Sequence, residues 1–381
     1  MHQALRKAIP TVLVLVMLVG ACNESTGPNG NGNGNGPPVA AEVFVLNSLS
    51  KTISRFVVRG DALESAGGAI TLPPNFDGVA FDMFDDVWVT TISAAGGSQV
   101  VFGSLASGEQ AVSTFPDPNG ALADPSKPTV VVDLVGNIGT LVGTRWTNSV
   151  YIAFPGAAAQ LLAADVGEFV ERVLPGGQAL LSIDANLDDV GGTFQPLGDP
   201  RIQFHDQLTG AFIDEVPFVG ATNANDGVFF QSDVLVLAGG GFGPPPDFAP
   251  NNDGQVIVMN AIARGVITSL DLEGNGISLE AGRNSLNYIT RTTGSDFGST
   301  DLLVFNLITK TWVRGPNNAL EPKDASGADL NCWAASALLD SRILCVTFAF
   351  GTAGRLVLLD ANGAFLDEAA VGQGATDLIV R

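Results

Sequence analysis

Few side chains in this sequence could carry acid–base chemistry. Of the two histidines, His2 lies in an N-terminal segment that we expect to be removed on export, so His205 is the one candidate base. A single histidine excludes multi-histidine zinc centres and leaves one candidate for a catalytic triad. His205 falls in a strand-like run, and we interpret it as a partly buried strand residue. No Walker loop or HExxH motif occurs, and the glycines at 239–241 are followed by prolines instead of a helix start.

One group of oxygen ligands has a spacing that suits calcium. Asp184, Asn186 and Asp188 alternate along the chain, and Asp189 follows directly. Hard oxygen ligands at alternate positions of a loop are typical of Ca²⁺ sites. The segment lacks the glycine and the distal glutamate of an EF-hand, so a solvated turn is the other interpretation and the one we favour. Ca²⁺ is the one cofactor that the sequence suggests.

The N-terminus has the pattern of an export signal. Arg6 and Lys7 give a positive start, and residues 8–18 form an apolar run that is too short to span a membrane. The following Val-Gly-Ala-Cys22 resembles the lipobox of bacterial lipoproteins, whose cysteine thiol receives diacylglycerol before cleavage. The resemblance implies that residues 1–21 are removed and that Cys22 is lipidated. An ordinary secretory signal with a chance cysteine is the alternative.

Residues 22–38 follow as the lipidated cysteine and a tether. Glycine and asparagine alternate from 29 to 36, and no side chain there could form a core. Such a segment behaves as a flexible linker. We therefore expect a protein of the cell envelope, held to a membrane by its lipid; outer membrane, periplasmic face and cell surface all stay open.

The net charge restricts the partners. The formal charge of the chain is −21 and becomes −23 once Arg6 and Lys7 are removed. Such a protein repels nucleic acid and anionic lipid, and it suits cations or basic partners better. Alternatively, the negative charge only keeps the protein soluble and indicates no partner.

Two cysteines remain once Cys22 carries lipid. Cys332 and Cys345 lie on apolar segments that are joined by a turn through Asp340 and Ser341. An even pair in an oxidising compartment is expected to form a disulfide, here one that staples a hairpin. A redox role is disfavoured because the spacing is not Cys-x-x-Cys and because no basic residue stands next to either cysteine to lower its thiol pKa.

The rest of the chain, residues 39–381, predicts an all-β fold made of repeats. Short runs rich in β-branched and aromatic residues are bounded by Gly, Asn, Asp and Pro, and long helical periodicity is missing. A strand, a tight turn and a second strand recur at 203–213, 256–267, 303–313 and 356–366, with fainter copies near Ile53, Val100 and Val150. Seven units at about fifty residues each indicate radial or stacked repeats.

Two further strands fit between successive hairpins, so each unit is expected to be a four-stranded blade of a seven-bladed β-propeller. Residues 376–380 form a first strand with nothing after it, while 42–47, 52–58 and 69–72 form second, third and fourth strands with nothing before them. The C-terminal strand should therefore join the N-terminal blade and close the ring, which removes a free sheet edge.

The segment 42–53, Glu-Val-Phe-Val-Leu-Asn-Ser-Leu-Ser-Lys-Thr-Ile, resembles the repeats of YVTN and YncE-like (NHL-like) β-propellers. The turn Asp360-Ala-Asn-Gly363 matches the corresponding hairpin turn, whereas 100–115 and 150–166 depart from the pattern. The resemblance implies a radial scaffold that is most often used for binding. It transfers no catalytic residue.

Loop length nominates one binding face. In a propeller, the connections between second and third strands and those between blades emerge on the same face. The long connections at 116–128, 184–200, 239–254 and 315–329 all belong to this group, which we call the long-loop face. Its candidate binding residues combine aromatic rings with carboxylates: Trp146, Phe242, Asp247, Phe248, Asp253, Asp296 and Phe297.

Two functions from different classes follow. The first is a binding module whose long-loop face stacks on a glycan or grips a protein or basic peptide. The second is a metal-dependent propeller hydrolase or lactonase that uses carboxylates such as Asp77, Asp226 and Asp377. We favour binding over an enzyme, because no compact set of acid, base and metal ligands can be assembled from the sequence without assuming the fold.

Overall fold

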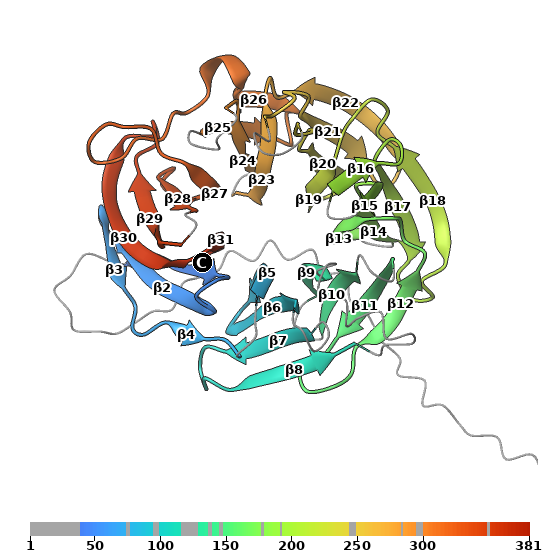
Figure 1. Cartoon of the computed structure of the whole chain (residues 1–381), viewed down its shortest axis with the longest axis horizontal. Helices are drawn as coiled ribbons and strands as arrows, with labels where there is room; N and C mark the ends of the chain where they lie inside the picture. The colour runs from blue at the N-terminus through green and yellow to red at the C-terminus, as the bar shows by residue number, and fades with distance from the viewer. Residues whose placement is uncertain are drawn as a thin grey trace, which may run out of the picture. The chain divides into compact units, whose positions relative to one another are not determined.

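The computed structural model describes residues 39–381 except for 74–76, 94–98, 116–128, 136–138, 145–147, 177–178, 191–192, 244–248, 283–284, 295–299 and 349–350. The predicted signal segment, Cys22 and the tether lie outside this part. Seven four-stranded antiparallel sheets form a ring, so the prediction of a seven-bladed β-propeller is confirmed (Figure 1). Among the described residues, no helix is long and apolar enough to cross a membrane.

The blades are numbered here along the chain from the first complete sheet. Blade 1 contains β5 (Asp77–Phe84), β6 (Val87–Ser93), β7 (Gln99–Ser104) and β8 (Gln110–Thr114). Blade 2 contains β9 (Thr129–Val135), β10 (Gly139–Thr144), β11 (Ser149–Ala153) and β12 (Gln160–Ala164). Blade 3 contains β13 (Val170–Gly176), β14 (Ala179–Asp184), β17 (Arg201–Asp206) and β18 (Phe212–Pro217), with the hairpin β15 (Leu187–Val190) and β16 (Thr193–Pro196) inserted between β14 and β17.

The second half of the ring continues the pattern. Blade 4 contains β19 (Ala224–Phe230), β20 (Asp233–Ala238), β21 (Gln255–Asn260) and β22 (Gly265–Asp271). Blade 5 contains β23 (Asn275–Ala281), β24 (Leu286–Thr292), β25 (Asp301–Asn306) and β26 (Thr311–Arg314), after which a short 3-10 turn, η3 (Pro316–Asn318), begins the link to the next blade. Blade 6 contains β27 (Cys332–Ala337), β28 (Ile343–Thr347), β29 (Ala353–Leu359) and β30 (Phe365–Gln373).

Blade 7 is built from both ends of the chain. Its strands are β31 (Ala375–Val380), β1 (Val39–Asn47), β2 (Thr52–Arg59) and β3 (Ala62–Ser65), and the short β4 (Ile70–Thr71) also pairs with β2. β1 and β31 pair from Val43 opposite Val380 to Asn47 opposite Ala375. The predicted closure by the C-terminal strand is therefore confirmed.

One strand assignment was wrong. The fourth strand of blade 7 was expected at residues 69–72, but it is β3, Ala62–Ser65, directly after the turn at Gly60 and Asp61. Gly60 has a positive φ of 54°, which lets the chain reverse at once. Residues 70–71 form only the two-residue strand β4 against the other end of β2.

Burial follows strand position within a blade. The second and third strands lie between neighbouring blades, and their residues are mostly buried, as in β20 and β21. The outer strand β22 instead alternates exposed and half-buried residues. Apolar side chains of neighbouring blades pack face to face; for example, Val45 and Phe56 of blade 7 share a core with Leu356 of blade 6. This packing produces a core that runs around the ring.

The predicted disulfide is confirmed. Cys332 on β27 and Cys345 on β28 are bonded, with their Cα atoms 5.4 Å apart, and both side chains are fully buried. The bond joins the first and second strands of blade 6, so it staples a hairpin as expected.

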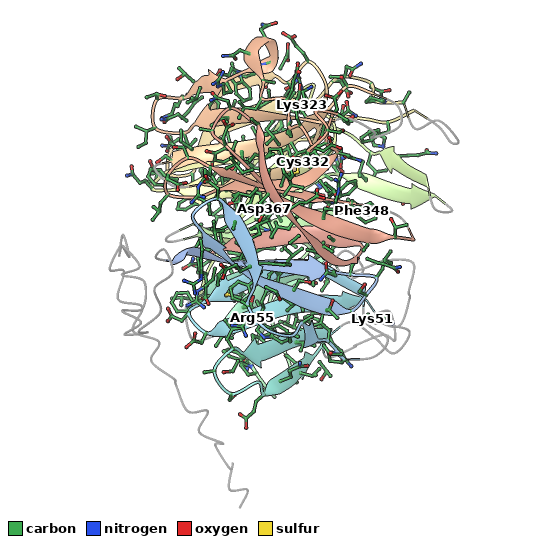
Figure 2. The ribbon with its side chains drawn as sticks, turned by 90° about the vertical axis from the view of Figure 1, so that its left-hand side faces the viewer. Lys51, Arg55, Lys323, Cys332, Phe348 and Asp367 are labelled. Carbon is green, nitrogen blue, oxygen red and sulfur yellow. A yellow bond between two sulfur atoms is a disulfide. The ribbon has the colours of Figure 1, made fainter. Side chains whose placement is uncertain are left out.

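The two faces of the ring differ as the sequence predicted. Tight turns such as 85–86, 231–232 and 261–264 join strands on one face. The other face carries 185–200, with its extra hairpin, and 239–254. Seen edge-on, Lys51 and Phe348, from two connections of this long-loop face, lie toward the same side of the ring (Figure 2). The link 315–331 differs, because the Lys323 N–H donates to the Gly363 carbonyl in a tight turn of the opposite face.

Candidate functional site

A repeated irregularity marks the innermost strand of every blade. The pairing of each of these strands with its neighbour shifts register near its first residues, as in a β-bulge. The shifts fall at or beside Ala80, Val131, Glu171, Asn225, Ile277, Trp333 and Thr376. First strands begin at the long-loop face, so the bulges form a ring at that mouth of the propeller. Bulges re-aim side chains and are frequent beside functional sites.

Charged side chains directly follow three of these bulges, and two of them, Arg172 and Asp226, face one another across blades. Asp226 on β19 comes after the bulge residue Asn225, and its Oδ1 lies 3.6 Å from Arg172 Nε on β13. Asp226 Oδ1 also accepts the Gly227 N–H at 2.7 Å, and Oδ2 accepts the Leu279 N–H of β23 at 3.3 Å. The carboxylate thus connects blade 4 with both of its neighbours.

Three more carboxyl groups interact with this pair. Asp377 on β31 follows the bulge at Thr376 and accepts the Leu378 N–H at 2.8 Å, as Asp82 on β5 accepts the Met83 N–H at 2.7 Å. Glu280 on β23 interacts electrostatically with Asp377, Asp226, Arg172 and Asp82. We call Asp82, Arg172, Asp226, Glu280 and Asp377 the inner acidic cluster. It draws four acids and one base from five blades.

Burial, with a smaller contribution from mutual repulsion, raises the pKa values of three acids of this cluster. Burial, with smaller contributions from the charges of Asp226 and Asp82, raises the pKa of Asp377 to about 7 against the lowering effect of Arg172 and the Leu378 N–H. Burial and the neighbouring Asp377 and Asp226 raise the pKa of Glu280 well above its ordinary value. Burial also raises the pKa of Asp226. One arginine cannot neutralise four carboxylates, so the cluster favours protons or a bound positive charge.

This pKa shift gives a pH-dependent stability. Because the pKa of Asp377 is about 7 in the fold and ordinarily 3.8, the folded chain keeps a proton that the unfolded chain releases between these values. Stability should therefore fall as the pH rises through this window and then level off. We expect Asp377→Asn to raise the free energy of unfolding by about 1–3 kcal/mol at pH 8 and to leave it unchanged at pH 3.5. Urea titrations at the two pH values measure this.

Asp206 supplies the control for this measurement. Its pKa is lowered by hydrogen bonds, first from the Thr209 hydroxyl and then from the N–H groups of Thr209 and Leu208. Asp206→Asn should therefore reduce stability at pH 8, opposite to Asp377→Asn. An Asp377→Asn chain that is no more stable than the parent at pH 8 would contradict the raised pKa.

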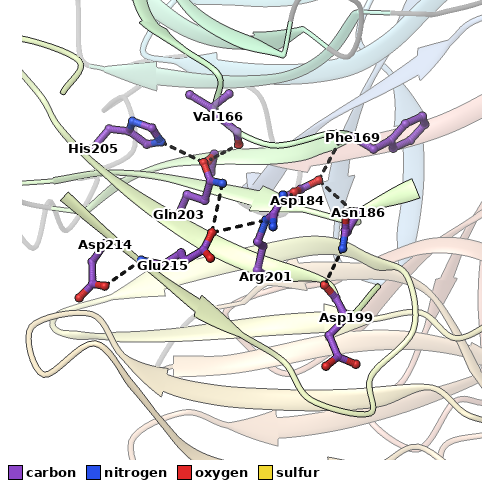
Figure 3. A network of polar contacts seen from close by, with 11 residues as sticks. Val166, Phe169, Asp184, Asn186, Asp199, Arg201, Gln203, His205, Asp214 and Glu215 are labelled. Carbon is purple, nitrogen blue, oxygen red and sulfur yellow. Dashed lines mark hydrogen bonds and ion pairs between the residues drawn. The ribbon is translucent and has the colours of Figure 1, made fainter. Parts of the chain in front are cut away.

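Asp184 of the proposed calcium group lies in a buried network of hydrogen bonds and ion pairs (Figure 3). The fully buried Asp184 carboxylate accepts N–H groups from Phe169 at 2.8 Å and Asn186 at 2.9 Å, and Arg201 Nε at 3.0 Å. The Asn186 side chain donates to the Asp199 carbonyl. Asp188 is exposed on β15, and the side chain of Asp189 lies outside the described part. The calcium interpretation stays a prediction, but Asp184 has a structural role.

His205 is buried on β17. Its Nδ1 lies 3.3 Å from the Gly210 carbonyl, and its Nε2 lies 3.3 Å from Gln203 Oε1. Burial lowers the pKa of His205, against the raising effect of the Gly210 carbonyl. Both ring nitrogens thus have protein partners, which agrees with its interpretation as a strand residue.

Two of the predicted binding-face residues are described. Asp253 accepts the Gly241 N–H at 2.8 Å, and Asn275 accepts the Asn252 N–H, so side chains fix the base of the glycine-rich connection. Gly240 has a φ of 86°, and a Cβ there would meet Asp253 Oδ1 at 2.7 Å. Phe242 pairs with Pro250 through an isolated bridge in the same connection. Trp146, Asp247, Phe248, Asp296 and Phe297 lie outside the described residues.

The carboxylates proposed for a hydrolase are partly brought together. Asp226 and Asp377 interact within the inner acidic cluster, whereas the side chain of Asp77 is not described. Asp82, Arg172 and Glu280 were missed by sequence reasoning. In the described part of the chain, no three His, Cys, Asp or Glu side chains have a geometry that could hold a metal ion.

Comparison with known proteins shows the fold. No family model and no curated protein matches the chain. Among solved structures, the periplasmic gluconolactonase PpgL of Pseudomonas aeruginosa is similar with a TM-score of 0.58 and 13% identity, over 89% of this chain and 98% of that one. The dihydro-heme d1 dehydrogenase NirN has a TM-score of 0.52 and 12% identity, over 90% of this chain and 75% of that one.

A functionally unknown protein from Desulfotomaculum acetoxidans DSM 771 has a TM-score of 0.51 and 12% identity, over 87% of this chain and 99% of that one. The common feature is the propeller. Identities this low transfer no ligand, substrate or catalytic residue to this chain.

Proposed function

We propose that this chain is an exported, lipid-anchored β-propeller that binds a positively charged ligand at the long-loop mouth of its ring. The anchor rests on the resemblance of residues 19–22 to a lipobox. The ligand-binding role rests on the inner acidic cluster and on two polar side chains next to it in the sequence, Asn225 and Thr376. A basic peptide is the ligand class that suits these groups best.

The observation that carries this proposal concerns two bulge residues. Asn225 Oδ1 and Thr376 Oγ1 are buried and have no hydrogen-bond partner among the described residues. Each directly precedes an acid of the cluster, Asp226 or Asp377. Buried polar atoms in native proteins are generally satisfied, so each of these two atoms points to a bound water or ligand next to its strand. An amide oxygen, a hydroxyl and an excess of carboxylates together suit an ammonium or guanidinium group.

Charge favours the same partner. The formal charge of −21 attracts cations from a distance, and the carboxylates at the mouth would then meet them at close range. Aromatic side chains predicted on the long-loop connections, Trp146 and Phe248, would add stacking contacts beside the charged group.

The test measures binding of a short lysine-rich peptide by calorimetry, with an uncharged peptide of equal length as reference. The parent chain should bind only the charged peptide, and more weakly as salt rises. Asp226→Asn combined with Glu280→Gln should weaken binding at least about tenfold, since each lost charge-assisted contact contributes about 1.5–3 kcal/mol. The matched control is Asp214→Asn, which changes a half-exposed acid on the outer strand β18, away from the inner acidic cluster.

Equal affinity for the two peptides, or unchanged binding by the double variant, would contradict the proposal.

Substitution of Trp146, Phe242 and Phe248 together tests separately whether the connections of the long-loop face contact the ligand. This triple variant should lose ligand capture without a lower melting temperature if these rings contact the ligand.

A hydrolase is the second candidate. The observation in its favour is the pKa of Asp377, which at about 7 is suited to a general acid or base near neutral pH. The described residues do not fit the metal that this alternative invoked, because no three potential ligands converge among them. Turnover of a lactone that disappears in Asp377→Asn would favour the hydrolase over the binding module.

A further inference from the structure

Four tight turns on the face opposite the long loops expose large aliphatic side chains. Leu208, Ile262 and Ile308 are 79%, 81% and 59% exposed, and they occupy the turns between third and fourth strands of blades 3, 4 and 5. Leu339 is 65% exposed in the turn between β27 and β28 of blade 6. These four residues, which we call the aliphatic tips, therefore lie on consecutive blades and on one face.

Three of the tips are held in place by the same local structure. The side-chain oxygen of Asn260 accepts the N–H groups of Ile262 at 3.1 Å and Ala263 at 2.7 Å. Asn306 does the same for Ile308 and Thr309, and Asp206 for Leu208 and Thr209. In such Asx turns, the Asp or Asn side chain bonds to the backbone N–H of the residue two positions later, whose own side chain takes no part. The fold therefore does not require a large aliphatic side chain two residues after the Asp or Asn.

The charges beside the tips are balanced. Arg264, Lys310 and Arg342 share turns with Ile262, Ile308 and Leu339. Each of these bases forms an ion pair, with Asp214 at 3.4 Å, Asp233 at 2.6 Å and Asp340 at 2.7 Å respectively. The acids paired with these three bases therefore balance their charges beside Ile262, Ile308 and Leu339, so an uncharged, zwitterionic lipid surface suits these turns.

The chain enters the propeller on the same face. Val39, the first residue of β1, pairs with Arg59, the last residue of β2, beside the tight turn at Gly60 and Asp61. Sixteen residues separate Cys22 from Val39. A glycine-rich chain of this length that behaves as a random coil has a typical end-to-end distance of about 20–24 Å. A lipid on Cys22 would thus favour an orientation with this face toward the bilayer.

We propose that the aliphatic tips insert into the interfacial layer of the bilayer to which the chain is anchored. Exposed aliphatic groups gain free energy when they leave water for the boundary between headgroups and acyl chains. The contact fixes the tilt of the ring, so that the long-loop mouth points away from the membrane, toward ligands. This inference rests on the proposed lipid anchor, and the experiment separates the two.

The experiment places a tryptophan on each face of the full-length lipidated chain. Ile262→Trp reports on the tips, and Val219→Trp, also at a position 81% exposed but in a connection of the long-loop face, is the matched control. Each chain is reconstituted into vesicles of ordinary or brominated phosphatidylcholine. Bromine on the acyl chains quenches the fluorescence of an indole ring only where that ring enters the bilayer. Because interfacial groups are buried by about 5–10 Å, the added tryptophan of Ile262→Trp should lose about half of its fluorescence. Val219→Trp should keep its emission.

Three outcomes overturn the proposal. Quenching of Val219→Trp would place the long-loop face on the membrane, and no quenching of either would leave both faces in water. A change that follows protein concentration instead of bromine content would identify a second copy of the chain as the occupant. The mass of the N-terminal fragment shows separately whether Cys22 carries lipid. If it does not, the anchor is wrong, and quenching of Ile262→Trp at excess vesicles then decides on the tips alone.

Discussion

Arg201→Leu is expected to lower the free energy of unfolding by about 3–5 kcal/mol, because it leaves a buried carboxylate without its charge partner. Asp184 has no solvent exposure, and Arg201 Nε lies 3.0 Å from its Oδ2 at the start of β17. Two backbone N–H groups would remain as its partners. Urea unfolding followed by circular dichroism measures the loss.

An exposed ion pair of equal length provides the control. Arg59 Nε also lies 3.0 Å from a carboxylate, that of Glu64, but on the outer part of blade 7 where water screens both groups. Arg59→Leu should change stability by only about 0–1 kcal/mol. Equal losses of stability in Arg201→Leu and Arg59→Leu would contradict the prediction, because burial of Asp184 would then add nothing to its ion pair.

Removal of the disulfide is expected to have the next largest effect. Cys332→Ala with Cys345→Ala should lower the free energy of unfolding by about 3 kcal/mol, as expected for a loop with a sequence separation of 13 residues. The bond lies inside blade 6, which borders the closing blade. The same urea titration measures the change.

Reductant distinguishes loss of the bond from loss of the side chains. A reducing agent should lower the stability of the parent chain and leave the double variant unchanged. A parent chain whose unfolding is insensitive to reductant would show that the bond does not contribute. The buried sulfur atoms would then matter only through packing.

The fold was largely readable from the sequence, because its repeat is local. The hairpin at 203–213 predicted β17 and β18 from two β-branched and aromatic runs around an Asx turn, and three further hairpins had the same form. The misplaced fourth strand of blade 7 shows the limit. Ala62–Ser65 is short and half polar, so it has little of the alternation that marks a strand, and only its pairing with β2 defines it.

The inner acidic cluster was only partly predictable. Asp226 and Asp377 could be nominated as channel carboxylates once a propeller was assumed. Arg172 and Glu280 could not, because the register shifts on the innermost strands break the two-residue periodicity that tells which face a side chain occupies. Asp82 and Asp377 are almost three hundred residues apart in the sequence, and only the closed ring brings their charges together.

Blade 7 also determines the order in which the molecule can be completed. β1 leaves a ribosome or an export channel before every other strand of the propeller, and its partner β31 leaves after all of them. Until residues 375–380 emerge, one edge of β1 has no strand beside it, while six sheets can already form. Until then the nascent chain presents a pairing edge to neighbouring chains, and the pairing of residues 375–380 with β1 is the event that ends this exposure.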